Sequence, residues 1–132
     1  MQKLIIKTLK EEEIVDLTDK INELLKKENI KQGICHLFAV HTTCSLTTLD
    51  LDPGTDLDFF FFFLKIFPSM SYRHSHDPSH VGDHIISSII GPSVTIPIEE
   101  GQLVLGTWQR VVLVELSGPR EREIILQIFQ EK

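Results

Sequence analysis

Five consecutive phenylalanines, Phe59 to Phe63, limit the folds open to this chain more than any other feature. The turn signal Asp52-Pro53-Gly54 precedes them, so the segment from Asp56 to Phe67 is predicted to be a helix. On a helix, five successive aromatic side chains cover every face. We therefore expect the helix to be enclosed on all sides or to lie in a subunit interface. A buried strand is the alternative, because phenylalanine also favours strands.

Length and composition predict one globular domain that spans residues 1–132, since the 132 residues are 42% hydrophobic and 24% charged. The net charge of -6 and the absence of a basic run argue against nucleic acid or an anionic membrane as a partner. A small molecule is the expected partner. The segment Met1 to Lys7 lacks the features of a signal peptide, so we expect a cytoplasmic protein with Cys35 and Cys44 reduced.

Hydrophobic periodicity predicts helices and strands in an α+β domain with antiparallel sheets. Thr18 is a candidate cap for a helix that ends near Glu28, and a further helix follows Ser79 up to the stop signal Gly91-Pro92. Gly33 to Thr48 reads as two strands or as one long bent strand. The remaining strand candidates are Gln2–Leu9 and Glu13–Leu17, which we expect to form an opening hairpin, and Ser93–Ile98, Leu103–Thr107, Val111–Leu116 and Ile124–Phe129.

The segment from Tyr72 to His84 holds four of the six histidines of the chain. His80 and His84 have the i, i+4 spacing that places two side chains on one helical face, where they can bind one metal ion. His74 or His76, on the preceding loop, is the candidate third ligand. The alternative is a polar, solvated loop without a bound metal.

Three further polar residues are candidates for a functional site because of their place in the sequence. His41 stands at the junction of the two central strand candidates and is followed by hydroxyl side chains that can bind a phosphate or a carboxylate. Glu115 interrupts an apolar strand and needs a partner, unless it faces solvent or serves as a ligand or base. Arg120 is a candidate anion clamp, and its alternative role is that of an ordinary turn cation.

Several ordered blocks of residues cover nearly the whole chain. They are His41-Thr42-Thr43 with Ser45-Leu46-Thr47, Tyr72-Arg73-His74, His84-Ile85 with Gly91, and Leu105-Gly106-Thr107-Trp108-Gln109 leading to Glu115 and Gly118-Pro119-Arg120. With these blocks the sequence resembles the YjbQ-like family, also called the secondary thiamine-phosphate synthase family. The resemblance implies a β-sandwich of mainly antiparallel strands with flanking helices, assembled as a homotrimer.

The resemblance also implies a function. The family name reflects a weak thiamine-phosphate synthase activity, which joins a pyrimidine pyrophosphate to a thiazole phosphate. We therefore expect a small metal-binding enzyme that acts on a phosphorylated small molecule. The alternative is a non-catalytic trimeric protein that binds a phosphorylated metabolite.

Site residues are carried over from the family by position. His41, His74 and His84 are the expected metal ligands, and zinc is the expected metal because it suits three neutral imidazoles. His80 is the substitute ligand. Family members commonly place an Asn-Glu pair after Ser-Leu-Thr, whereas this chain has Leu49-Asp50, so Asp50 stands in for the acid. The expected catalytic residues are Glu115 and Asp50, and the expected ligand-binding residues are Thr42, Thr43, Ser45, Trp108, Gln109 and Arg120.

Overall fold

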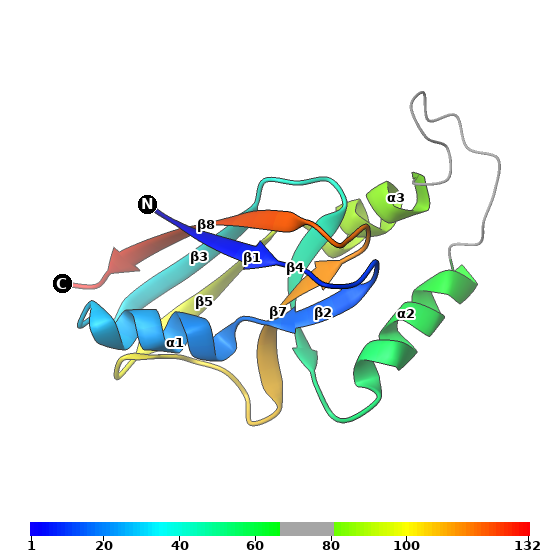
Figure 1. Ribbon diagram of the computed structural model, residues 1–132. Coiled ribbons are helices and arrows are strands. Elements are labelled where there is room, and N and C mark those ends of the chain that lie inside the picture. Colours follow the sequence, from blue (N-terminus) through cyan, green and yellow to red (C-terminus); the bar gives the residue numbers. More distant parts are fainter. Residues whose placement is uncertain (67–80) are drawn as a thin grey trace.

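The protein is described by a computed structural model that covers residues 1–66 and 81–132 (Figure 1). Three helices and eight strands occupy these residues. In chain order the elements are β1 (Gln2–Lys7), β2 (Glu13–Asp16), α1 (Thr18–Lys27), β3 (Gly33–Ala39), β4 (Cys44–Asp50), α2 (Thr55–Ile66), α3 (Val81–Ile90), β5 (Ser93–Glu99), β6 (Gln102–Leu103), β7 (Gln109–Glu115) and β8 (Glu121–Gln130).

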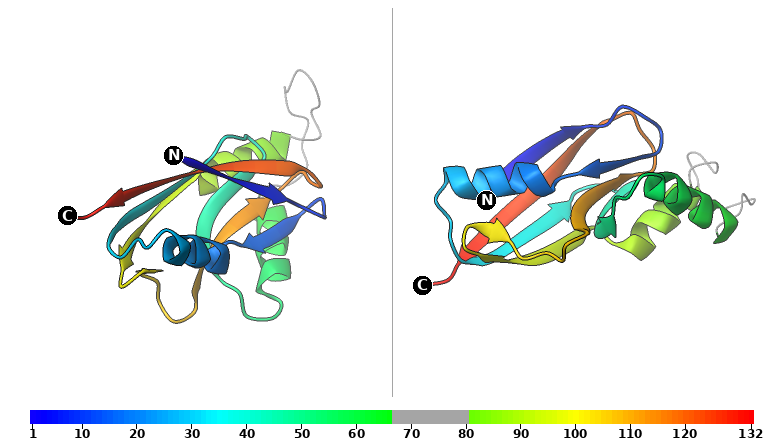
Figure 2. Two further views of the ribbon diagram at one scale, coloured as in Figure 1. Left: turned by 60° about the vertical axis from the view of Figure 1, so that its left-hand side comes forward. Right: turned by 90° about the horizontal axis from the view of Figure 1, so that it is seen from below.

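The strands form two sheets, and every strand pair is antiparallel, as the predicted α+β class requires. The larger sheet has the order β1-β8-β3-β5-β6, and the smaller has the order β2-β7-β4. Side chains from both sheets and from α1 share one hydrophobic core, in which Ile21, Leu37 and Leu113 are completely buried. Figure 2 shows helix α1 beside the strands in two further views.

Strand β7 is apolar on both faces because both faces of the smaller sheet are covered. Val111 and Leu113 belong to the core shared with the larger sheet. Val112 and Val114 belong to a second cluster, against which helices α2 and α3 pack. Alternate side chains of a strand point to opposite faces. The continuous run of apolar residues is thus the sequence signature of a strand buried on both sides.

The phenylalanine run lies on a helix, as predicted, but the described residues cover that helix on one side only. Phe59, Phe60 and Phe63 pack against the second cluster. Phe61 and Phe62 have 61% and 58% of their surface exposed. The expectation that the helix is enclosed on all sides is therefore not met within the single chain, and the buried-strand alternative is wrong.

The predicted opening hairpin is also wrong. β1 pairs with β8 in the larger sheet, whereas β2 pairs with β7 in the smaller one. The segment between them crosses from one sheet to the other. The central segment behaves in the same way, because β3 and β4 are two strands that belong to different sheets.

Two local predictions differ from the structure in detail. Thr18 is the first residue of α1 and not its cap; its hydroxyl accepts a hydrogen bond from the Val111 amide at 2.8 Å. The strand candidate Leu103–Thr107 is reduced to β6, because the residues after it form a loop. Cys35 and Cys44 are buried thiols that form no disulfide, in line with the expected reduced state.

Candidate functional site

Three loops meet at one end of the fold, beside helix α3 (Figure 1). We call residues 8–12, 40–43 and 116–120 the loop end. Backbone hydrogen bonds connect the three segments: the amide of Gly118 donates to Glu11 O at 2.9 Å, and the amide of Leu116 donates to Thr43 O at 3.1 Å. The Ser87 hydroxyl of α3 donates to Cys44 O at 2.6 Å, which attaches the helix to the start of β4. The loop end is therefore one connected structure.

A buried ion pair lies beneath the loop end. The Arg122 Nε atom donates to Glu115 Oε2 at 2.7 Å, and the guanidinium also reaches Glu115 Oε1. Glu115 has no exposed surface, and Arg122 is 2% exposed. The partner that Glu115 requires in its apolar strand is thus Arg122, a residue that the sequence analysis did not single out.

The ion pair connects all three loops. Arg122 donates to the hydroxyl and the carbonyl oxygen of Thr43, at 2.9 and 3.1 Å. Glu115 accepts hydrogen bonds from the Thr8 hydroxyl at 2.8 Å and from the Ser117 amide at 3.0 Å. Every loop that forms the end is therefore held by one member of the pair. A buried hydrogen-bond network of this kind favours a single loop arrangement.

The acidity of Glu115 reflects these bonds. Burial acts to raise the pKa of its carboxyl group, but the hydrogen bonds from Arg122, the Ser117 amide and Thr8, together with the charge of Arg122, hold the pKa below its ordinary value. The carboxylate is consequently ionised at neutral pH, and it cannot act as a general base of raised pKa.

We expect the free energy of unfolding to fall when the pH drops below 4.5, the ordinary pKa of a glutamate. The unfolded chain takes up a proton at Glu115 near that pH, whereas the folded chain resists protonation until a lower pH. The ionised Glu115 carboxylate contributes fully to the free energy of unfolding above the pKa that it has in the unfolded chain. This contribution is lost as the pH falls through its lower pKa in the folded chain. Urea unfolding at a series of pH values checks this, and Glu115→Gln should show a shallower loss over the same range.

His41 lies on the loop between β3 and β4 and is half-buried. Its Nε2 atom accepts a hydrogen bond from the Glu123 amide at 2.8 Å. Burial and the nearby Arg122 hold the pKa of His41 below its ordinary value, against the opposing charges of Glu115 and Glu123. The ring is therefore neutral at neutral pH.

The hydroxyl groups after His41 differ in their access to solvent. Thr42 is exposed. Thr43 is 8% exposed, and its hydroxyl is bound to Arg122. Ser45 is completely buried, and its hydroxyl oxygen has no hydrogen-bond partner among the described residues. Thr42 is thus the hydroxyl of this set that can contact a ligand in the single chain.

Arg120 is exposed on the loop between β7 and β8. Its Nε atom donates to Ser117 O at 2.7 Å, and its amide donates to the Thr8 hydroxyl at 2.9 Å. The backbone of this arginine is therefore tied to the same network as Glu115. Such a fixed cation on the surface is suited to bind an anion.

Asp50, Trp108 and Gln109 lie far from the loop end. They line a shallow pocket of about 360 Å³ together with Thr48, and the Gln109 side chain donates to the Thr48 hydroxyl at 3.0 Å. The pairs Cys44–Glu115 and Asp50–Gln109 mark opposite ends of the β4–β7 ladder, about 20 Å apart at the usual rise of a strand. The described site residues at the two ends of this ladder therefore form two groups that do not meet within one chain.

Two of the three predicted metal ligands, His41 and His84, lie in the described part of the chain. His74 lies outside the described residues, as do His76 and His80. Within residues 1–66 and 81–132, no three side chains of His, Cys, Asp or Glu form a group that could hold a metal ion. His41 has its Nε2 atom engaged, as described above, and His84 is half-buried on α3. The zinc site stays a prediction.

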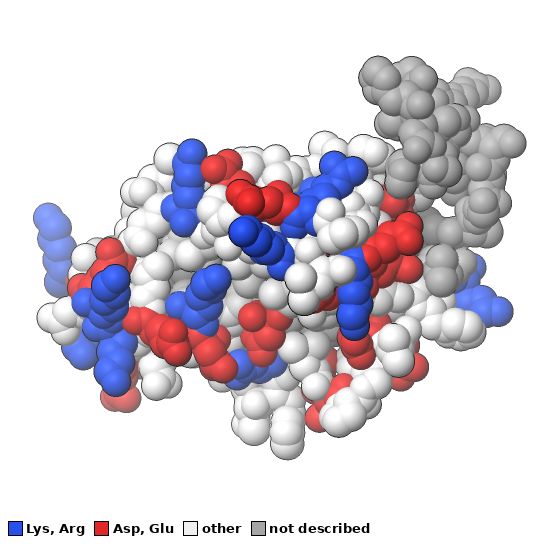
Figure 3. Space-filling model, in the orientation of Figure 1, with Lys and Arg blue, Asp and Glu red and all other residues white. Residues whose placement is uncertain are grey.

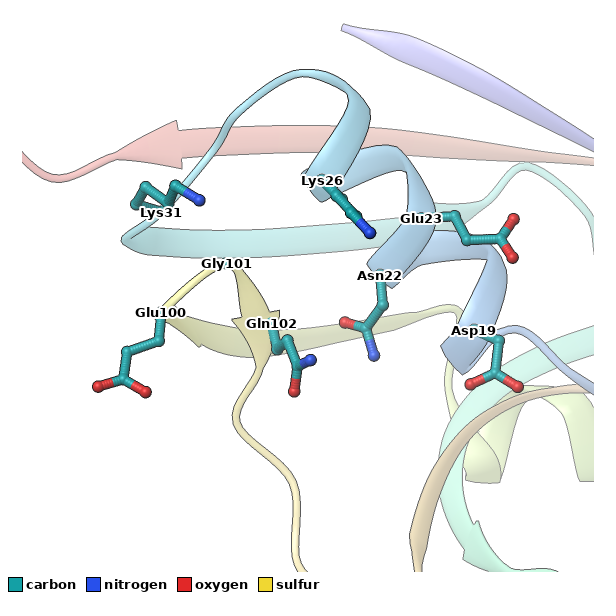
Figure 4. Close-up of a pocket in the computed structure, with 8 residues that line it drawn as sticks. All are labelled: Asp19, Asn22, Glu23, Lys26, Lys31, Glu100, Gly101 and Gln102. Carbon is teal, nitrogen blue, oxygen red and sulfur yellow. The ribbon is translucent and has the colours of Figure 1, made fainter.

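The remaining surface offers no clear alternative site in the described part of the chain. Figure 3 shows acidic and basic side chains interspersed over one face of the protein. A pocket of about 500 Å³ between α1 and the β5–β6 turn contains no predicted site residue. Figure 4 shows that Asp19, Glu23 and Glu100 surround it together with Lys26 and Lys31, so its charges are mixed. None of the helices in the described ranges has the length and hydrophobicity needed to cross a bilayer.

Comparisons with known proteins agree with the architecture. The chain is similar to a UPF0047 protein of Archaeoglobus fulgidus, with 34% identity over 94% of this chain and 97% of the relative. It is similar to the UPF0047 protein YugU of Bacillus subtilis, with 30% identity over 98% of both chains. A YbjQ-like protein of unknown function from Sulfolobus solfataricus has a crystal structure that matches with a TM-score of 0.90 and 33% identity, over 98% of this chain and 96% of that one.

The fold, the order of the sequence blocks and these relatives lead to one assignment. The family model described as "UPF0047 protein YjbQ-like" matches residues 2–131, and this chain belongs to that family.

Proposed function

We propose that the loop end binds the phosphate group of a small molecule and that the protein is an enzyme acting on it. The observation that supports this proposal is the buried Glu115–Arg122 pair directly beneath the loops that carry His41, Thr42 and Arg120. A buried ion pair is rarely the most stable filling for a core, because both charges lose their hydration. A buried ion pair beneath exposed polar residues can, however, fix the arrangement of those residues.

The chemistry that this arrangement supports is binding and orientation. The exposed Arg120 guanidinium matches a phosphate in charge and shape, and the Thr42 hydroxyl can donate a further hydrogen bond. The reaction implied by the family resemblance joins a pyrimidine pyrophosphate to a thiazole phosphate, and both reactants carry such groups. Holding the two reactants in place accounts for a large share of catalysis in bimolecular reactions.

We expect Arg120→Gln to weaken the binding of inorganic pyrophosphate about tenfold, the effect of losing one charge-assisted hydrogen bond of about 1.5 kcal/mol. Calorimetric titration measures the affinity. Lys132→Gln is the matched control, because it removes one positive charge at the opposite end of the molecule (Figure 1). Equal weakening in both variants would mean that net charge and not the loop end governs binding.

A turnover assay separates the enzyme from the alternative, a non-catalytic binding protein. If the proposal is right, wild-type protein forms thiamine phosphate from the two phosphorylated precursors, and Arg120→Gln forms it more slowly. Saturable binding of the precursors without product would support the binding protein. Zinc dependence is tested in the same assay by chelation and metal replacement, with His84→Ala as the variant that removes a predicted ligand.

Self-association as a homotrimer is the second part of the proposal. The outer face of the larger sheet exposes four large apolar side chains, with exposed fractions between 40% and 61%, a pattern typical of an interaction surface. The register places Ile34 beside Phe129 on adjacent strands. The pair His36–Gln127 lies between them and Phe38, so this surface combines apolar and polar side chains. The four exposed apolar residues are Ile5, Ile34, Phe38 and Phe129.

We expect light scattering to give the mass of three chains for the wild-type protein. Phe38→Glu should dissociate the trimer, because it places a charge in the middle of the sheet surface. Phe61→Asp, on α2, tests the alternative that the exposed phenylalanines of this helix form the interface. A wild-type monomer at micromolar concentration would end the assembly proposal, and dissociation by Phe61→Asp alone would move the interface to α2.

A further inference from the structure

The His41 ring is held by the backbone of a neighbouring strand. The ladder between β3 and β8 ends at the pair Ala39–Ile124, and the amide of the next residue on β8, Glu123, donates to His41 Nε2 at 2.8 Å. At this point the chain has left β3, so no β3 carbonyl is available to that amide. The imidazole supplies the acceptor that the ladder lacks, and a partly buried N–H group needs such an acceptor.

This hydrogen bond determines where the ring carries its proton. A backbone N–H group can donate but cannot accept, so Nε2 must be unprotonated. A neutral imidazole with an unprotonated Nε2 carries its proton on Nδ1. Turning the ring over about the Cβ–Cγ bond would replace Nε2 with a carbon atom and would lose the bond. The tautomer of His41 therefore follows from the fold.

The same bond is incompatible with two other states of the ring. A metal ion on Nδ1 requires the proton on Nε2, which would then face the Glu123 N–H as a second donor at 2.8 Å. The doubly protonated ring has the same conflict. The charged groups around the ring are Arg122, Glu115 and Glu123, and the two members of the buried pair largely offset each other.

We propose that His41 is a neutral donor, which offers Nδ1–H to an oxygen of an anionic ligand such as a phosphate, and that it is not a metal ligand in this conformation. The donor role rests on the proposed function of the loop end, whereas the tautomer rests on the Glu123 hydrogen bond alone. With Arg120 and Thr42, His41 then provides a third polar contact from the same end of the fold.

Nitrogen-15 NMR of the labelled full chain at pH 7.5 tests the proposal. Long-range proton–nitrogen spectra distinguish the two neutral tautomers, and a His41→Gln sample identifies the His41 signals. We expect the Nδ1–H form, unchanged by an equimolar amount of zinc. His36→Gln serves as the assignment control, because His36 lies on β3 with its Nδ1 atom 2.8 Å from the Thr95 hydroxyl. An Nε2–H signal, or a zinc-induced shift of His41 Nδ1, would overturn the proposal.

Titration with inorganic phosphate separates the two parts. If His41 is a donor, its Nδ1 proton shifts together with the backbone amides of Thr42 and Arg120. A response of those amides without the His41 proton would overturn the donor role alone. No response at any of the three would count against the proposed function and with it the donor role, while the tautomer would stand.

Discussion

Arg122→Met should lower the free energy of unfolding by about 3–5 kcal/mol, because it leaves the Glu115 carboxylate buried without its counter-charge. The guanidinium makes four hydrogen bonds, two to Glu115 and two to Thr43, and all of them disappear together. Urea unfolding measures the change. Glu115→Met should cost a similar amount, since it leaves the arginine unpaired in the same place.

Two further variants serve as controls for the unfolding measurement on Arg122→Met. Arg110→Met breaks the exposed pairs with Asp16 and Asp19 and should cost about 0.2–1 kcal/mol. The double variant Glu115→Met with Arg122→Met should be more stable than either single variant, because it removes both charges. If Arg122→Met were as stable as the wild type, the Glu115 carboxylate would have found another partner. The Glu115–Arg122 pair would then not be what fixes the loop end.

Gly118→Ala should destabilise the protein by about 3 kcal/mol through steric overlap. A Cβ atom at this position would lie 2.1 Å from the carbonyl oxygen of Lys10 and 2.9 Å from the Thr8 hydroxyl oxygen. Lys10 O belongs to the backbone and cannot move alone. The loop between β1 and β2 would have to shift, which would also disturb the hydrogen bond from Thr8 to Glu115.

Gly82→Ala is the matched control. A Cβ atom at Gly82 would meet no atom of the described residues within 4 Å, and Gly82 lies in helix α3. Because alanine favours helices over glycine by about 1 kcal/mol, this variant should be as stable as the wild type or more stable. Thermal unfolding of the two variants side by side distinguishes a local overlap at Gly118 from a general sensitivity to alanine. Equal stability of Gly118→Ala and wild type would contradict the close packing of the loop end.

Much of the fold could be predicted because strands and helices follow from local patterns. Strand alternation puts Cys35 and Leu37 on one face and Phe38 on the other, and the structure buries the first two and exposes the third. The sheet to which each strand belongs could not be predicted in this way. β1 and β2 are neighbours in sequence, yet each pairs with a strand from the last quarter of the chain.

The site was less predictable because it depends on pairing between strands that are distant in sequence. Glu115 was recognisable as a carboxylate in need of a partner, but its partner was identified only by the structure. The sequence did contain a signal for this partner. Arg122, Ile124 and Leu126 are two residues apart along β8, so the arginine lies on the same buried face as the two apolar residues. The separation of Trp108 from His41 depends on the β4–β7 register, which local patterns do not determine.

The pairing of β1 with β8 has a consequence for the order in which the protein can assemble. β8 lies between β1 and β3, so β1 has no neighbour in its sheet until β8 has been made. During synthesis β1 must wait with its apolar residues Leu4 and Ile6 uncovered by β8. Sheets that depend on contacts so distant in sequence form slowly, and a nascent chain in this state is a natural client for chaperones.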